Sequence, residues 1–165
     1  MVFNSILARR GCKKIDYKKL LDWMKLAKER GLKAVGYVGN GEPLAFKQFV
    51  QISNEINELG LDQGIFTNGY LIDRYIDQLL NFIYVRISLD AGSNEIHSKL
   101  HAVPLNHFDK IKKNVELLVN RRNENSPSIG FQFATHQDNI DDLENAVILA
   151  KELGIEYLSI KCSGK

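Results

Sequence analysis

The sequence predicts an α/β fold, in which about five parallel strands with covering helices form a partial (β/α) TIM-like barrel. Strand-like apolar segments and amphipathic helical segments alternate four times, and the last recognisable element is a strand. Such alternation is typical of parallel βαβ units. The 165 residues are 44% hydrophobic and 25% charged, which suits one ordinary domain with a substantial core. Right-handed crossovers either curl such strands toward a barrel or lay them in an open doubly wound sheet.

The first half of the chain sets this alternation. Residues 16–31 place apolar side chains at helical spacing and stop at a glycine, as helices commonly do. Residues 34–39 are a short apolar strand. Residues 43–60 are expected as a helix with proline in its first turn and glycine at its end, the favoured positions of these residues. Residues 64–69 are a strand that ends in an Asn-Gly turn.

The second half repeats the pattern with one longer connection. Residues 84–91 form a strand rich in β-branched and aromatic side chains, which fit a pleated sheet. Residues 92–107 are expected as a loop with a short helix. The remaining elements are helices at residues 71–82, 108–122 and 138–154 and strands at residues 128–135 and 155–161. We treat residues 1–165 as one partial domain.

Charge and cysteine content exclude several classes of protein. The net charge is +2 and the basic side chains are scattered along helices, so neither a nucleic-acid patch nor a membrane-binding surface is expected. Cys12 and Cys162 lie near opposite ends of the sequence, which gives neither a disulfide framework nor a CxxC metal site. The sequence shows no secretory signal and no apolar run of bilayer length. A cytoplasmic location is therefore expected.

Polar, glycine-rich segments lie at the ends of the expected strands. In chain order they read GNGEP, TNGY, SLDAGS, THQDN and KCSG. The carboxyl ends of parallel strands meet at one rim, where barrels and doubly wound sheets carry their chemistry. Gly39 and Gly41 stand close together although glycine costs conformational entropy. A ligand that approaches the main chain closely is one explanation, so we expect a binding site at this rim.

The same segments resemble those of a known family. GNGEPL is similar to the GGEP segment of the radical S-adenosylmethionine (radical SAM) superfamily, and FTNGYLI is similar to its TNG turn. VRISLDAGSNEIHSKLH, followed by FDKIKKNVELL, resembles the fourth strand and the next helix of that superfamily. Order and spacing agree from about residue 16 to residue 161. The similarity is to the branch whose members end in SPASM or twitch accessory cluster domains.

The resemblance implies two cofactors, SAM and a [4Fe-4S] cluster. In such enzymes three cysteines of a CxxxCxxC loop hold the cluster, and the amino and carboxylate groups of SAM chelate the fourth iron. One electron from the cluster cleaves SAM to a 5'-deoxyadenosyl radical, which abstracts a hydrogen atom from the substrate. A small-molecule or peptide substrate and a reductant such as ferredoxin or flavodoxin are the implied partners. The protein positions these groups and excludes water.

The resemblance also implies roles for individual residues. The ammonium group of SAM would meet Gly39, Asn40, Gly41 and Glu42, because carbonyl groups and a carboxylate accept hydrogen bonds from a cation. Asn40 stands where the family more commonly has glycine. The other implied contacts are Asn68, Ser88 and Asp90 for the ribose hydroxyls or the methionine end, Lys99 for the methionine carboxylate, and Thr135 with the backbone around Ile160 for adenine.

The cysteines depart from the family pattern. A cluster needs several converging thiolates, whereas Cys12 stands alone before the helix that begins near residue 16. We therefore expect a fragment or a degenerate relative that lacks the cluster loop at its start and further chain at its end, and that is inactive alone. No residue is assigned to a metal. Open strand edges at residues 34–38 and 157–161 are expected to favour self-association.

Simpler interpretations of the site residues remain open. Glu42 could cap the helix that follows it, and Asp90 could do the same for the next short helix. Asn68 with Gly69 could form only a turn. Ser88 stands on an otherwise apolar strand, which favours ligand contact.

Two other functions also remain open. The chain could be a non-catalytic half-barrel that acts as a binding or scaffold protein. It could instead be a fragment of an ordinary (β/α) barrel lyase, for which Lys161 is the available Schiff-base lysine. His97 and His101 could share one helical face, but without an HExxH arrangement no metal role is expected.

Overall fold

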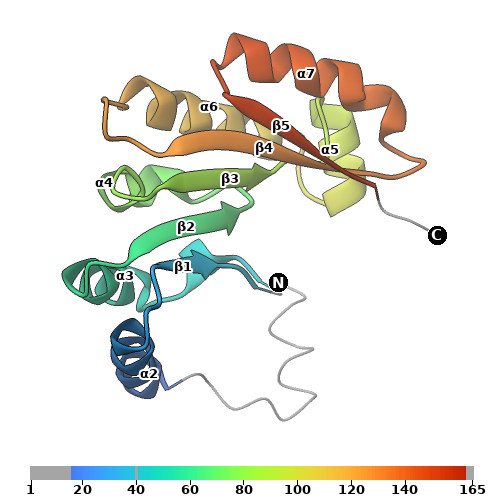
Figure 1. Cartoon of the computed structure of the whole chain (residues 1–165). Helices are drawn as coiled ribbons and strands as arrows, with labels where there is room; N and C mark the ends of the chain where they lie inside the picture. Colours follow the sequence, from blue (N-terminus) through green and yellow to red (C-terminus); the bar gives the residue numbers. More distant parts are fainter. Residues whose placement is uncertain (1–15, 40, 163–165) are drawn as a thin grey trace, which may run out of the picture.

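A computed structural model describes residues 16–39 and 41–162 and contains one sheet of five parallel strands (Figure 1). The strands are β1 (Ala34–Tyr37), β2 (Asp62–Thr67), β3 (Tyr84–Ser88), β4 (Ser128–Thr135) and β5 (Tyr157–Cys162). They pair in chain order, as in a (β/α) barrel, whereas a doubly wound sheet reverses its order at a switch point. The α/β class and the partial-barrel order are therefore confirmed.

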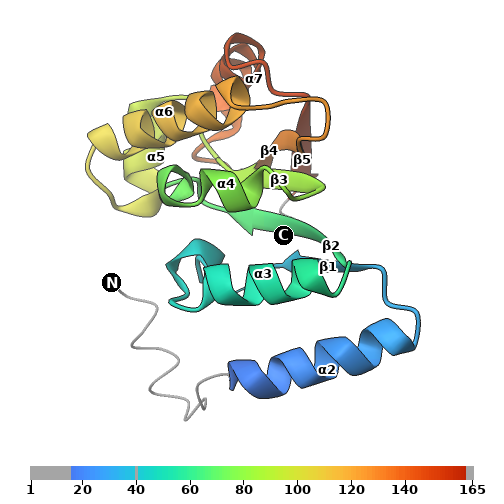
Figure 2. The ribbon, with the colours of Figure 1, turned by 90° about the vertical axis from the view of Figure 1, so that its left-hand side faces the viewer.

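Helices cover one face of this sheet, which we call the outer face. Figure 2 shows α2, α3, α4 and α6 lined up along it. None of the helices within residues 16–39 and 41–162 is long and apolar enough to cross a membrane. The helices are α2 (Tyr17–Glu29), α3 (Phe49–Glu58), α4 (Ile76–Leu79), α5 (Asn94–His101), α6 (Asn106–Asn120) and α7 (Leu143–Glu152), and the 3-10 turns are η1 (Pro43–Ala45), η2 (Ile72–Arg74) and η3 (Ile140–Asp142).

The two faces of the sheet differ because successive side chains of a strand point to opposite sides. The outer face holds fully buried apolar residues, among them Ile65, Val85, Ile87 and Phe131. The inner face carries half-buried side chains that lie in register across the strands, Phe66 beside Arg86 and Ser88 beside Gln132. The barrel interior is thus polar and aromatic, while the main core lies between the sheet and the helices.

The helix expected over residues 43–60 is two elements. Glu42 caps the 3-10 turn η1 through a hydrogen bond from Leu44 N, and Phe46 then has extended backbone (φ −76°, ψ 122°). The helix proper, α3, begins only at Phe49. The apolar periodicity correctly predicted a helix in this region. It did not show that the first turn is a separate element, capped by Glu42 and not continuous with the helix.

The connection after β2 also differs from the single helix expected there, whereas the connection after β3 holds the short helix expected within its loop. Residues 71–82 form η2 and a single turn, α4, because Tyr75 between them leaves helical geometry (φ −135°, ψ 23°). Residues 92–107 hold all of α5, whose C-cap residue Ala102 is in the left-handed conformation (φ 51°). The helix α6 then begins at Asn106.

Candidate functional site

A cavity of about 530 Å³ opens at the carboxyl ends of β1 to β4, and we call it the rim cavity. Its size lies in the range of about 300–1,000 Å³ typical of small-molecule sites. The loops after β1, β2 and β3 supply most of its lining. The lining residues are Val38, Gly39, Gly41, Glu42, Pro43, Phe66, Thr67, Asn68, Ser88, Asp90 and Gln132.

Glu42 is fixed in this cavity by three hydrogen bonds. Its Oε1 accepts from Leu44 N at 3.1 Å and from Thr67 Oγ1 at 2.6 Å, and its Oε2 accepts from Asn68 N at 2.8 Å. The carboxylate therefore caps η1, as the simpler interpretation holds, and also joins the ends of β1 and β2. Two carboxylate oxygens offer about four acceptor positions, so Oε2 retains capacity for one further donor.

The TNG segment after β2 is a well-braced turn. Asn68 Oδ1 accepts a hydrogen bond from Tyr70 N at 2.9 Å, and Gly69 has a positive φ of 81°, which glycine adopts readily. The buried Asn114 of α6 donates from Nδ2 to the carbonyls of Gly69 and Tyr70. The turn interpretation of Asn68 is correct, and the same turn places this residue on the cavity wall.

Asp90 does not cap α5, because Ser93 is the N-cap and its Oγ accepts from Ile96 N. Asp90 instead occupies the left-handed region (φ 54°), where a non-glycine residue is uncommon and such strain clusters at functional sites. Its Oδ1 accepts from Ala134 N at 2.7 Å, and its carbonyl accepts from Asn139 Nδ2 at 2.9 Å. The cap interpretation is wrong, and Asp90 connects the end of β3 to the end of β4.

Two buried side chains that sequence reasoning missed hold this loop in place. Asp142 Oδ2 accepts hydrogen bonds from Gly92 N, Ser93 N and Ser93 Oγ at 2.6, 3.0 and 3.0 Å. Asn139 bridges the carbonyls of Asp90 and Ala134. Both residues are at least 95% buried, with exposed fractions of 2% for Asn139 and 5% for Asp142. Short polar side chains in the DNIDD segment indicate a turn. They do not indicate which distant residues the turn will contact.

The glycines beside Glu42 are not demanded by the fold itself. A Cβ at Gly41 would meet no described atom within 4 Å, and one at Gly39 would make only ordinary contacts of 3.6 and 3.8 Å. Neither residue is among those with positive φ. Gly92 differs, because a Cβ there would overlap the backbone of α7 at Ala146. The space at Gly39 and Gly41 is therefore open to a bound molecule.

The structure brings six of the ten predicted site residues to the rim cavity, and they are Gly39, Gly41, Glu42, Asn68, Ser88 and Asp90. Asn40 lies outside the described residues. Lys99 is elsewhere, with its Nζ 3.2 Å from Asp138 Oδ1 and its side chain 64% exposed. Thr135 and Ile160 lie farther along the rim on β4 and β5, where Thr135 Oγ1 donates to the carbonyl of Lys161 at 3.3 Å.

No group of three or more His, Cys, Asp or Glu residues within residues 16–39 and 41–162 is arranged to hold a metal ion. Cys162 is exposed, and Cys12 lies outside the described part of the chain. His97 of α5 has its Nε2 3.1 Å from Nδ1 of His107, and its ring stacks on that of His107 and lies tilted against that of His101. Burial and the two neighbouring imidazoles lower the pKa of His97 to about 4, so the His97 ring is neutral near pH 7.

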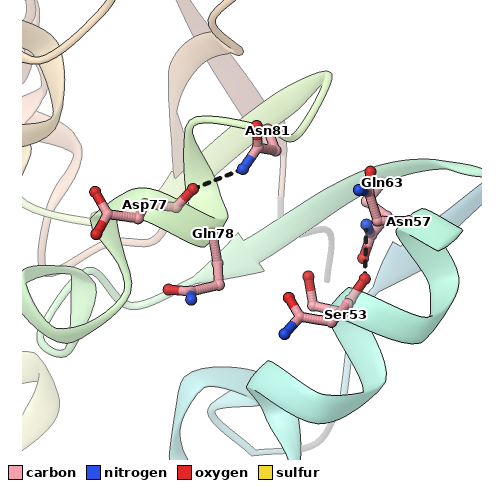
Figure 3. Close-up of a pocket in the computed structure, with 7 residues that line it drawn as sticks. Ser53, Asn57, Gln63, Asp77, Gln78 and Asn81 are labelled. Carbon is pink, nitrogen blue, oxygen red and sulfur yellow. Dashed lines mark hydrogen bonds between the residues drawn. The ribbon is translucent and has the colours of Figure 1, made fainter.

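A second cavity of about 170 Å³ lies at the opposite end of the sheet, between α3, α4 and the start of β2 (Figure 3). Its lining is polar, but the groups bond to one another. Gln63 Nε2 donates to the Ser53 carbonyl, and Asn81 Nδ2 donates to the Asp77 carbonyl. Gln63 Oε1 also accepts from the Tyr37 hydroxyl at 2.7 Å. This end of a barrel usually serves stability, so the rim cavity is the candidate site.

Comparison with known proteins decides the family. The sequence profile of the radical SAM superfamily matches residues 2–150. This chain belongs to the radical SAM superfamily. The resemblance carried by GNGEPL, FTNGYLI and VRISLDAGS is therefore confirmed, and members of this superfamily use SAM and a [4Fe-4S] cluster.

Two curated proteins are similar to this radical SAM chain. A tungsten-containing aldehyde ferredoxin oxidoreductase cofactor-modifying protein of Pyrococcus furiosus is 28% identical over 137 residues, which cover 78% of this chain and 37% of that protein. A GTP 3',8-cyclase of Synechocystis is 34% identical over 90 residues, which cover 53% of this chain and 27% of that protein. The chain thus spans roughly a third of the length of these relatives.

Solved structures share the fold. SuiB of Streptococcus suis, solved with the precursor peptide SuiA, superposes with a TM-score of 0.72 at 19% identity, over 90% of this chain and 33% of SuiB. An archaeal TYW1 superposes with a TM-score of 0.68 at 15% identity, over 93% of this chain and 60% of TYW1. These structures are TIM-like barrels, so the five described strands correspond to part of such a barrel.

Proposed function

We propose that the rim cavity binds SAM and that the chain is the SAM-binding part of a radical SAM enzyme. The observation that carries this proposal is a cradle, the open space at Gly39 and Gly41 beside the Glu42 carboxylate, because the fold does not need these two glycines for its own packing. A cation fits there because the Glu42 carboxylate has unused acceptor capacity. Because the chain belongs to the radical SAM superfamily, SAM is the ligand that we propose for this cradle.

The remaining lining groups suit the rest of SAM. Asn68, Ser88 and Asp90 line the same cavity, so they are proposed for the ribose hydroxyls or the methionine end. Thr135 and the backbone around Ile160 are proposed for adenine, farther along the rim. Lys99 is proposed for the methionine carboxylate, and that contact requires its Nζ to leave Asp138.

We propose that the described residues hold SAM and do not hold the cluster. The sequence contains two cysteines, fewer than the three thiolates that the superfamily uses, so we propose that the thiolates come from residues outside this sequence. A reduced cluster beside bound SAM would supply the radical chemistry that the superfamily uses. This chain's own share is to bind SAM, orient it against the barrel interior and keep water from it.

The proposed partners follow from the same assignment. A peptide or a small molecule is the proposed substrate class, because SuiB, a radical SAM neighbour, is solved with a precursor peptide. Ferredoxin or flavodoxin is the proposed reductant. Self-association through the open edges of β1 and β5 stays a prediction, and size-exclusion chromatography that shows one monomeric peak at all concentrations would contradict it.

The lyase alternative has no support from the site. Lys161 is exposed on β5, whereas a Schiff-base lysine is usually activated by apolar surroundings. The half-barrel binding or scaffold protein differs from our proposal only in catalysis.

Titration of the chain with SAM by isothermal calorimetry tests the proposal. Gly41→Val fills the open cradle, and we expect at least about tenfold weaker binding, as for overpacked sites, with an unchanged urea unfolding midpoint. Glu42→Gln should weaken SAM binding in the same direction, while the matched control Glu58→Gln, on the exposed end of α3, should not. Unchanged affinity in both site variants, or no SAM binding by the unaltered chain, would disprove the proposal.

A further inference from the structure

The inner face of the sheet carries a cation that the SAM site does not use. Arg86 of β3 precedes Ser88 by two residues on the same face, so it lies about 6.6 Å deeper in the barrel. Its Cζ is 4.8 Å from the ring centroid of Phe66, 5.3 Å from that of Tyr157 and 5.9 Å from that of Tyr84. Phe66 also lines the rim cavity, so Arg86 adjoins the lower wall of that cavity.

The aromatic surroundings of Arg86 are built into the strands. A Cβ at Gly64 would overlap the ring of Tyr84, and a Cβ at Gly130 would overlap the ring of Tyr157. Each ring therefore lies against the bare backbone of a neighbouring strand. Glycine weakens a strand interior and often marks a close approach of another group. The two glycines thus make room for the rings that hold the guanidinium by cation–π contact.

The guanidinium has donors to spare. Arg86 Nε donates to the Tyr157 hydroxyl at 3.2 Å, whereas Nη1 and Nη2 form no hydrogen bond with any described residue. Across residues 16–39 and 41–162, no carboxylate forms an ion pair with Arg86. A half-buried cation without an anion is costly. The Tyr157 hydroxyl accepts from Arg86, so its own proton is available to a second acceptor.

We propose that Arg86, with Tyr157, anchors an oxyanion group of the substrate, either a carboxylate or a phosphate, below the SAM site. The two Nη groups present parallel N–H donors, which match the paired oxygens of such a group. The bound molecule would extend along the inner face past Ser88 and Gln132 toward the rim cavity. The assignment of that molecule as substrate rests on the proposed function, but the oxyanion site itself does not.

Nuclear magnetic resonance on the ¹⁵N-labelled chain tests the site with simple probes. Benzoate and phenyl phosphate are the anionic probes, and benzamide is the neutral isostere of benzoate. We expect the Nε–Hε signal of Arg86, assigned by its loss in Arg86→Lys, to shift saturably with an anion and not with benzamide. The anion that saturates at the lower concentration identifies the site as carboxylate-selective or phosphate-selective. No saturable shift of this signal with either anion would overturn the proposal.

Variants test which residue is responsible. Arg86→Gln should weaken binding of the preferred probe at least about tenfold, as expected for loss of a charge-assisted bidentate contact. The control Arg121→Gln, on the exposed pair with Asp77, should leave it unchanged. If Arg86→Gln does not fold, Tyr157→Phe keeps the ring and removes one donor, and it should weaken binding measurably. Unaltered probe affinity in a folded Arg86→Gln, or in Tyr157→Phe when that variant is the one tested, would disprove the assignment.

Titration with SAM separates this inference from the proposed function. Arg86→Gln should bind SAM as the unaltered chain does, because Arg86 does not line the rim cavity. If the unaltered chain binds the anion but not SAM, the proposed function fails and the oxyanion site stands. If it binds SAM but neither anion, the reverse holds.

Discussion

The outer and inner faces of the sheet come from the same strands, yet they are built differently. Outward residues such as Val85 and Phe131 are fully buried under the helices. Their immediate neighbours Arg86 and Gln132 face the barrel interior and are only half-buried. The comparison teaches that stability and ligand chemistry are divided between odd and even positions of one strand, so that a change at one position affects one property and spares the other.

The largest effect on the free energy of unfolding is expected from a substitution on the outer face. Phe131→Ala removes a fully buried ring and should lower the free energy of unfolding by about 3–5 kcal/mol. Its neighbour on the inner face is the matched control, and Gln132→Ala should change this free energy by less than about 0.5 kcal/mol. Urea denaturation of both variants checks the pair. Similar losses in the two variants would mean that the faces do not divide the work in this way.

A smaller loss in the free energy of unfolding is expected at Asp142, which holds the loop after β3 by hydrogen bonds. In the unaltered chain Asp142 Oδ2 accepts hydrogen bonds from Gly92 and Ser93, and Oδ1 accepts one from Asn145. Asp142→Asn leaves a single oxygen to accept from all of these donors. Weakening these buried hydrogen bonds should cost about 1–3 kcal/mol, measured by urea denaturation. The exposed neighbour provides the control, since Asp141→Asn should have no measurable effect. SAM affinity should fall with Asp142→Asn if the loop at Asp90 shapes the rim cavity.

The histidine cluster between α5 and α6 predicts that the free energy of unfolding depends on pH. The pKa of His97 falls from its ordinary value of 6.5 to about 4 in the folded chain, so the unfolded chain takes up this proton first. The free energy of unfolding should therefore be highest above pH 6.5 and should decrease as the pH falls toward 4.

Urea midpoints measured between pH 7 and pH 4 check this slope. His97→Gln should flatten it relative to the unaltered chain, while the exposed His136→Gln should not. A slope that is unchanged in His97→Gln would assign the acid sensitivity to other groups.

The smallest effect is expected at Lys99. Its pair with Asp138 is exposed on both sides, and exposed pairs contribute little. Lys99→Ala should leave the urea midpoint unchanged and should weaken SAM binding less than Glu42→Gln does. A stronger loss of SAM affinity than in Glu42→Gln would show that Lys99 reaches the ligand when SAM is present.

The sequence predicted the fold class, the strand order and most of the rim because these depend on local signals. Alternating strands and helices, and a polar segment after each strand, fix where Glu42, Asn68 and Asp90 meet. The missed features depend on contacts between distant residues. Nothing near Arg86 in the sequence indicates that Tyr157 will hold it, and the buried role of Asp142 appears only once Gly92 lies beside it. The separate short turn after Glu42 was not predicted, because Glu42 is held by Thr67, which belongs to the next strand.

The sequential strand order has a consequence for synthesis. Each strand pairs with the one made just before it, so every β/α unit can dock as soon as it leaves the ribosome, without waiting for distant chain. The longest delay falls between β3 and β4, because α5 and α6 are made in between. Growth from the amino end thus keeps one pairing edge ready for the next unit at each stage.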